Sequence, residues 1–219
     1  MTGASHASGA PPFSFEPASG RYPGAMTYAL LTGFGPFPGV TDNPSGHLVE
    51  DLAARPPTSI QLAATVLPVT FAGVPGALAA FLAGHEHERP VLLLSLGVHR
   101  GPGFRLERRA RAAPTSDRLD QAGGGGEGFA AERERATDLD LDALARDLAP
   151  AAARAGGVAV SDDAGGYVCD WTYQHLLQHG ERLGVPALFL HVPPIDQVPV
   201  AGQRPVVERL LELLLAPSG

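Results

Sequence analysis

Cys169 is the only cysteine in the 219-residue chain, and its surroundings suit a nucleophile. It follows a short apolar run at 158–160 and the pair Gly165-Gly166, and apolar residues at helical spacing come after it. This order predicts a strand, a tight turn and a helix whose first turn carries the thiol. Unpaired backbone N–H groups and the helix dipole favour a thiolate there. The competing interpretation is a small core residue, because free cysteine is often buried.

His191 is a candidate proton carrier for that thiol. It closes the apolar run 188–190, which predicts a buried strand, and prolines follow at 193 and 194. An imidazole at a strand end can take the proton of a cysteine and return it to a leaving amine. A hydrogen-bonded histidine at the sheet edge is the alternative. No Cys or His cluster has metal-ligand spacing, so we expect neither a metal site nor a cofactor.

Glu107 is a candidate for the carboxylate that orients the imidazole in a catalytic triad. It lies among arginines in the segment FRLERR at 104–109, and composition alone favours a solvated charge run there. Spacing along the chain leaves both interpretations open, because the members of a triad meet only in space.

The composition restricts the class of protein. The formal net charge of −7 argues against nucleic-acid binding, which requires a basic surface. No apolar run approaches the roughly 20 residues of a membrane helix. A lone cysteine forms no internal disulfide, so we expect a cytoplasmic protein without membrane or nucleic-acid partners. Residues 1–24 are rich in small and turn-forming residues and predict a disordered extension.

Strands alternate with helices through residues 25–219, which we expect to form one domain. The predicted strands are 28–33, 60–69, 90–97, 158–160 and 187–191. The predicted helices are 74–82, 139–155, 206–215, one beginning at Asn43-Pro44 and one after Gly166. This alternation predicts an α/β three-layer sandwich, with helices on both faces of a twisted mixed, partly parallel sheet. The glycine-rich segment 121–128 predicts a mobile loop.

Four segments resemble the pyroglutamyl-peptidase I (pyrrolidone-carboxylate peptidase) family of cysteine exopeptidases. They are TGFGPF followed by NPS (32–37 and 43–45), LGVHRGPGFRLER (96–108), AGGYVC (164–169) and FLHVP (189–193). All four occur in the family's order, which makes the combined match specific. The resemblance implies a phosphorylase/hydrolase-like fold and removal of N-terminal pyroglutamate (5-oxoproline) from peptides through an acyl-enzyme. It also implies a homo-oligomer, either a dimer or a tetramer.

The resemblance assigns a role to each site residue. It implies Cys169 as the nucleophile, His191 as base and then acid, and Glu107 as the carboxylate that positions the imidazole. Residues implied to bind the substrate come from the first loop, the turn before the cysteine and a stretch that brings an arginine to the oxyanion region. They are Phe34 and Phe37, Tyr167 and Val168, and Arg118 and Leu119.

The chain departs from the family pattern at three places. Asp162 and Asp170 stand where the family has amide residues, and an asparagine usual after the glutamate is absent, with Arg111 in that region. A carboxylate beside Cys169 opposes thiolate formation unless it caps the helix. Two alternatives therefore stay open. One is a catalytically degenerate relative that binds N-blocked peptides or lactams without turnover, and the other is an α/β enzyme that acts on nucleosides or esters.

Overall fold

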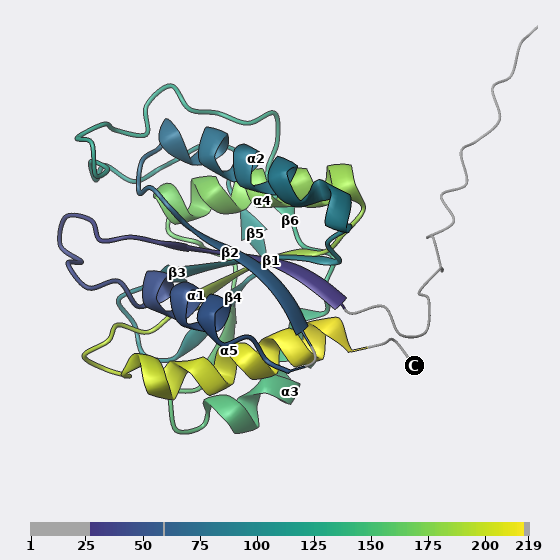
Figure 1. Ribbon diagram of the computed structural model, residues 1–219. Helices are drawn as coiled ribbons and strands as arrows, with labels where there is room; N and C mark the ends of the chain where they lie inside the picture. Colours follow the sequence, from purple (N-terminus) through teal and green to yellow (C-terminus); the bar gives the residue numbers. More distant parts are fainter. Residues whose placement is uncertain (1–26, 59, 217–219) are drawn as a thin grey trace, which may run out of the picture.

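A six-stranded sheet runs through the middle of the computed structural model, which describes residues 27–58 and 60–216 (Figure 1). The predicted extension 1–24 lies outside the described residues. The strand order is β2-β1-β3-β8-β4-β7. The strands are β1 (Thr27–Phe34), β2 (Ile60–Leu67), β3 (Leu92–Val98), β4 (Phe104–Glu107), β7 (Val158–Ser161) and β8 (Ala187–Val192).

The sheet is mixed. The strands β2, β1, β3 and β8 are parallel, and β4 runs antiparallel to β8 while pairing in parallel with β7. The change of direction falls between β8 and β4, so the carboxyl end of β4 does not lie at the same edge as that of β8. A separate antiparallel pair is formed by β5 (Arg109–Ala110) and β6 (Arg135–Ala136).

Helices cover both faces of the sheet (Figure 1). One face carries α2 (Gly73–His85) and α4 (Val168–Leu183), and the other carries α1 (Pro44–Ala54), α3 (Leu141–Ala152) and α5 (Val200–Leu215). A short 3-10 helix (Glu86–Glu88) follows α2. The predicted α/β three-layer sandwich with a mixed, partly parallel sheet is confirmed, and most of its strand pairs are parallel.

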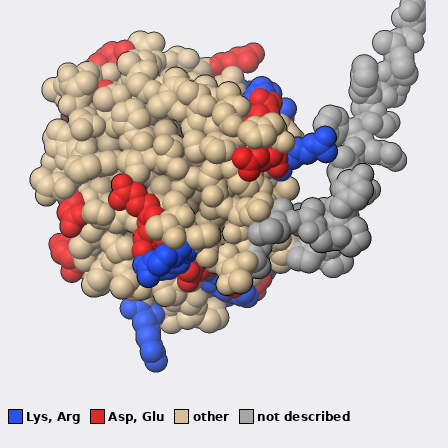
Figure 2. Space-filling model, in the orientation of Figure 1, with Lys and Arg blue, Asp and Glu red and all other residues tan. Residues whose placement is uncertain are grey.

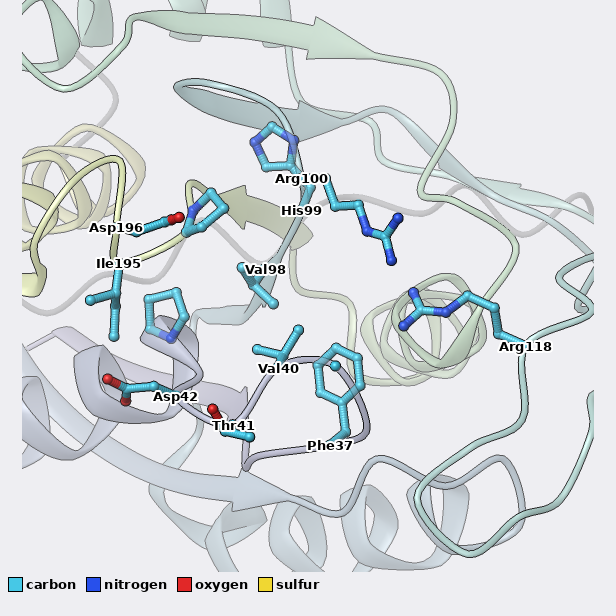
Figure 3. A pocket seen from close by; sticks show the side chains of 13 residues that line it. Phe37, Val40, Thr41, Asp42, Val98, His99, Arg100, Arg118, Ile195 and Asp196 are labelled. Carbon is cyan, nitrogen blue, oxygen red and sulfur yellow. The ribbon is translucent and has the colours of Figure 1, made fainter.

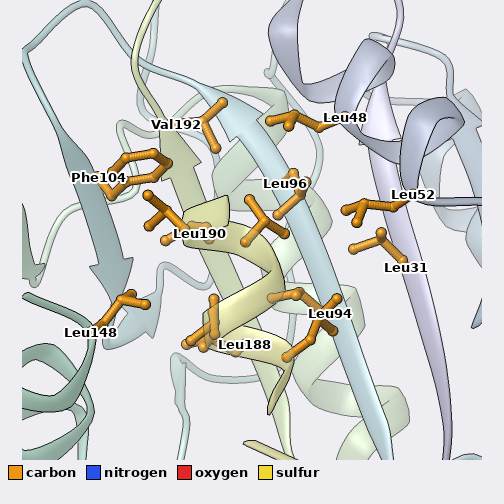
Figure 4. Close-up of a cluster of buried hydrophobic side chains, with 14 of the residues drawn as sticks. Leu31, Leu48, Leu52, Leu94, Leu96, Phe104, Leu148, Leu188, Leu190 and Val192 are labelled. Carbon is orange, nitrogen blue, oxygen red and sulfur yellow. The ribbon is translucent and has the colours of Figure 1, made fainter. Parts of the chain in front are cut away.

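Two apolar clusters hold the layers together, one on each face of the sheet. The larger cluster joins alternate side chains of the central strands, such as Leu94, Leu96, Leu188 and Leu190, to Leu48 and other residues of the covering helices (Figure 4). All six residues of β8 are buried, as are the first six of β3. Burial on both faces explains why these strands are unbroken apolar runs in the sequence.

The start of α1 follows the prediction, whereas α5 begins earlier than predicted. Asn43 caps α1, its side chain accepting a hydrogen bond from the Ser45 N–H, and Pro44 occupies the first turn. The helix α5 starts at Val200 rather than at 206, with Pro205 inside it. A proline within a helix removes a backbone hydrogen bond and usually marks a helix start or break, which moved the predicted start too far along the chain.

Among the described residues, no helix is both long and apolar enough to cross a membrane. The face shown in Figure 2 carries acidic and basic side chains in small separate groups between broad uncharged areas.

Candidate active site

Cys169 lies in the first turn of α4, as predicted. The chain leaves β7, turns through Gly165 (φ 93°) and Gly166 (φ 63°), and enters the helix at Val168. Both positive φ values are unfavourable for other residues, so the glycines make this turn possible. The thiol is half-buried and lies where the N–H groups of the first helical turn lack intrahelical acceptors.

The sulfur packs directly against β3. A Cβ atom added to Gly97 would lie 3.0 Å from the Cys169 Sγ and 2.7 Å from the ring of Phe189. Gly97 pairs with His191 in the register of β3 and β8. The missing side chain at Gly97 therefore lets the thiol approach the strand that carries the histidine.

His191 and Glu107 meet across the antiparallel pair β4–β8. The Glu107 Oε1 lies 2.8 Å from the His191 Nδ1, and the two residues are 0% and 5% exposed. Tyr173 of α4 donates a hydrogen bond of 2.8 Å to the backbone carbonyl of Glu107, which ties this strand end to the helix that carries Cys169. The interpretation of Glu107 as part of a solvated charge run is wrong, because its carboxylate is fully buried.

The charged groups around His191 favour its protonated form. Burial disfavours the imidazolium, but hydrogen bonds and charge interactions with Cys169 and Glu107 outweigh burial and raise the pKa of His191 to about 9. Since Nδ1 is bonded to Glu107, Nε2 is the ring nitrogen that remains for the thiol. Cys169, His191 and Glu107 are thus one connected group.

Aromatic side chains lie beside this group, but the two phenylalanines of the first loop have different environments. Phe37 packs against Tyr167, with ring centroids 6.1 Å apart, and lines a cavity. Phe34 is 2% exposed and packs against Phe189 in the core at 6.3 Å. Val168 is fully buried.

Arg118 and its neighbour Leu119 contact Tyr167 in different ways. The Arg118 guanidinium lies over the Tyr167 ring at 4.9 Å and over the Phe37 ring at 5.8 Å. The Leu119 side chain is 61% exposed, and its backbone carbonyl accepts a hydrogen bond of 2.9 Å from the Tyr167 hydroxyl. Asp120 follows with a buried carboxylate that accepts from the N–H groups of Phe71, Ala122 and Gly124, so the segment predicted as a mobile loop is anchored at its start.

A cavity of about 470 Å³ lies near this group, although none of the three connected residues is among those that line it (Figure 3). It is lined by residues of the loop 37–44, by the exit of β3 at 98–100, by Arg118 and by the exit of β8 at 194–196. The His99 ring in its wall lies 5.8 Å from the His191 ring. Among the described residues, no group of three or more His, Cys, Asp or Glu side chains is arranged to hold a metal ion.

Asp170, next to the cysteine, is paired rather than free. Its carboxylate is 2% exposed and accepts hydrogen bonds from the Gly166 N–H, the Arg111 N–H and the Arg111 guanidinium at 2.9–3.0 Å. The same guanidinium contacts Asp163 at 2.7 Å. The negative charge beside Cys169 is therefore balanced, and the carboxylate fixes the turn that precedes the helix. Asp162, the other acidic departure, is exposed and lies 3.4 Å from Arg108.

Comparison with known proteins supplies the family. The family model described as pyroglutamyl peptidase matches residues 27–207. The chain belongs to the pyroglutamyl peptidase family. Membership makes it an enzyme of this class, a hydrolase of the protease type.

Relatives and solved structures agree with this membership. A pyrrolidone-carboxylate peptidase of Clavibacter michiganensis is 32% identical over 189 residues, 82% of this chain and 84% of the relative. The human pyroglutamyl-peptidase 1 is 27% identical over 210 residues, 87% of this chain and 92% of the relative. The crystal structure of the pyrrolidone carboxyl peptidase of Fervidobacterium islandicum superposes with a TM-score of 0.76 at 27% identity, covering 86% of this chain and 98% of that one.

Three residues at or near this candidate site are not indicated by the sequence pattern. Gly97 looked like the end of a strand, although a glycine at the end of an apolar run was a usable signal for a close approach. The sequence does not distinguish His99 from the other histidines, yet the structure places it in the wall of the cavity. Arg111 stands at a departure from the family pattern, and no sequence pattern shows that it meets Asp170.

Proposed function

We propose that the protein is a cysteine exopeptidase that removes N-terminal pyroglutamate from peptides through an acyl-enzyme. The observation that carries the proposal is the buried 2.8 Å contact of His191 with Glu107, together with Cys169 at a helix N-terminus close enough to raise the pKa of His191, near a cavity. The family membership supports the substrate class, and the connected side chains support the mechanism.

The three side chains have distinct roles in this mechanism. Protonated His191 and the Cys169 thiolate form an ion pair, and the thiolate attacks the carbonyl carbon of the pyroglutamyl residue. The Glu107 carboxylate holds the imidazole ring in place and stabilises its positive charge. His191 then gives its proton to the nitrogen of the departing peptide, and water that His191 deprotonates hydrolyses the thioester.

Groups at the helix start stabilise the intermediate. The oxyanion that forms during attack needs hydrogen-bond donors, and the Cys169 backbone N–H in the first turn of α4 is one candidate. Arg118, stacked on Tyr167, is a second positive group near the same helix start. Loss of one such donor typically costs about 3 kcal/mol of transition-state stabilisation.

Aromatic surfaces explain why a lactam is recognised. A terminal pyroglutamate has no free amine, so it offers a flat ring with one N–H and one C=O instead of a cation. We assign Phe37 and Tyr167 to the aromatic contacts with this ring, since Phe37 lines the cavity and packs beside Tyr167. Phe34 and Val168, both buried, support the pocket from the core.

Steady-state hydrolysis of a pyroglutamyl coumarinyl amide tests the proposal. We expect hydrolysis by the wild-type protein and a loss of at least about a thousandfold in kcat/KM for Cys169→Ser and Cys169→Ala. The corresponding glutamyl amide, which lacks the lactam, is the control substrate and should remain uncleaved. Equal rates for wild type and both variants would reject Cys169 as the nucleophile and favour the alternative enzyme that acts on nucleosides or esters.

The degenerate-relative alternative makes a different prediction. It requires tight binding of an N-blocked peptide or lactam with no turnover and no alkylation of Cys169 at neutral pH. The balanced charge at Asp170 argues against it, because Arg111 removes the reason for expecting an inactive thiol.

A further inference from the structure

Two positively charged side chains face each other across one end of the active-site cavity. Arg100 follows β3 and Arg118 belongs to the segment after β5, and Figure 3 shows their guanidinium groups pointing toward one another. Both side chains are exposed, and neither has a carboxylate partner among the described residues. By contrast Arg108, Arg111 and Arg204 are each paired with an aspartate.

The acidic side chains of the cavity do not neutralise this pair. Asp42 and Asp196 lie at the opposite end of the cavity (Figure 3). Asp42 is bonded to His47 at 2.5 Å. The end with the two arginines therefore offers a place for an anion.

This end of the cavity adjoins the reacting groups. The Arg118 guanidinium lies 4.9 Å from the ring of Tyr167, two residues before the cysteine. Arg100 follows His99, whose ring lies 5.8 Å from that of His191. His99 is itself fixed, because its Nε2 lies 2.9 Å from the Gly103 carbonyl oxygen and its Nδ1 accepts from the Gly101 N–H.

We infer that Arg100 and Arg118 bind the free α-carboxylate of the residue that follows the pyroglutamyl group, so that pyroglutamyl dipeptides are preferred substrates. The inference rests on the proposed function. His191 must reach the leaving nitrogen, and the α-carboxylate carbon of a dipeptide is only two covalent bonds from that nitrogen. In a longer or amidated peptide, a neutral amide takes the place of this carboxylate.

Guanidinium groups suit this ligand. Each presents parallel N–H donors that match the two oxygens of a carboxylate. Stacking on two rings limits the motion of Arg118 and reduces the entropy lost on binding. In a peptide whose α-carboxylate is amidated, an acidic side chain still offers a carboxylate, but at a different position. The test therefore includes such a substrate.

The experiment compares kcat and KM for three substrates: pyroglutamyl-alanine, pyroglutamyl-alanine amide and pyroglutamyl-aspartic acid α-amide. For the wild-type enzyme we expect a KM at least about fivefold lower for the free dipeptide than for its amide, with similar kcat. The difference should shrink as salt is added, because exposed charge pairs are screened. In Arg100→Met the ratio of kcat/KM between the free dipeptide and its amide should fall close to one.

An exposed arginine on α3 provides the matched control. Arg146→Met also removes one positive charge, but from α3, which covers the opposite face of the sheet. This variant should keep the wild-type ratio of kcat/KM between the free dipeptide and its amide. Equal kcat/KM for the dipeptide and its amide in the wild-type enzyme would overturn the inference while leaving the proposed function intact. A preference for the aspartyl amide alone would overturn the assignment to the main-chain carboxylate. Failure to cleave all three substrates would reject the proposed function, and the inference with it.

Discussion

His191 lies between two groups that both favour its charged form, and this explains how a buried imidazole keeps a proton. Burial alone would lower its pKa, but contacts with Cys169 and Glu107 raise the pKa to about 9. A raised pKa means that the protonated form contributes stability fully below about pH 6.5, the ordinary value for histidine. That contribution is lost as the pH rises through about 9.

The pH dependence of the reaction should follow from this. Above about pH 9 His191 is neutral and cannot donate a proton to the leaving nitrogen, so kcat should fall on the alkaline side. Glu107→Gln removes one of the two contacts that raise the pKa of His191. We therefore expect the alkaline limb of the kcat profile to move to lower pH, with kcat reduced by about 10²–10⁴-fold at neutral pH. An unchanged alkaline limb in this variant would contradict the role given to Glu107.

The pair Asp170–Arg111 permits a second test at the residue scale. Asp170→Asn leaves a partly buried guanidinium with a weaker partner and loosens the turn at Gly166. We expect the free energy of unfolding in urea to fall by about 1–3 kcal/mol, with a parallel fall in kcat. Asp163→Asn is the matched control, because Asp163 contacts the same guanidinium but its side chain is 65% exposed. Its effect should stay below about 1 kcal/mol.

Individual elements contribute to the site through their ends. Asn43 caps α1 by accepting from the Ser45 N–H, and its amide group donates to the Gly35 carbonyl in the loop before Phe37. Asn43→Ala should lower the free energy of unfolding by about 1–2 kcal/mol and raise KM for a pyroglutamyl amide, because the loop loses an anchor. Asp140→Ala removes the exposed cap of α3 and should cost about 1 kcal/mol with KM unchanged. Equal effects of the two variants on KM would contradict the link between α1 and the pocket.

Close packing of β3 against the start of α4 is testable at Gly97. Gly97→Ala places a methyl group 3.0 Å from the Cys169 Sγ, which requires the thiol or the Phe189 ring to shift. We expect at least about a tenfold loss of kcat, measured with a pyroglutamyl amide, in a protein that still folds. Gly76→Ala on the exposed side of α2 meets nothing within 4 Å and should keep wild-type kcat. Wild-type kcat in Gly97→Ala would show that the sulfur is placed differently.

Most elements were predictable because local rules decide them. The cap at Asn43, the glycine turn before Cys169 and the apolar runs of β3 and β8 all follow from the chemistry of a few neighbouring residues. The start of α5 was not predictable from local rules. Pro205 lies inside this helix against the local preference of proline, and tertiary packing makes it tolerable there.

At the scale of the whole molecule, the layers were predictable and the meeting of distant residues was not. The direction of β4 relative to β8 decides whether Glu107 faces His191, and no local pattern specifies it. The contact between Arg111 and Asp170 likewise joins residues 59 positions apart. For the proposed catalytic residues, resemblance to a family was therefore more informative than spacing.

The distribution of charge and the oligomeric state are also properties of the whole molecule. The net charge of −7 coexists with two arginines at the candidate-site cavity that have no carboxylate partner among the described residues, which gives this cavity a positive end on an acidic protein. The predicted homo-oligomer, a dimer or tetramer, stays a prediction that sedimentation equilibrium tests directly. Leu119 and Val66 are large apolar side chains exposed among the described residues.

The most direct measurement is the mass of the enzyme during turnover. We expect acid quenching of the protein mixed with a pyroglutamyl ester to yield a covalent pyroglutamyl adduct, mapped by peptide mass to Cys169. The adduct should be absent from Cys169→Ala. Full turnover without an adduct, or an adduct on another residue, would contradict the claim that this cysteine carries the acyl group.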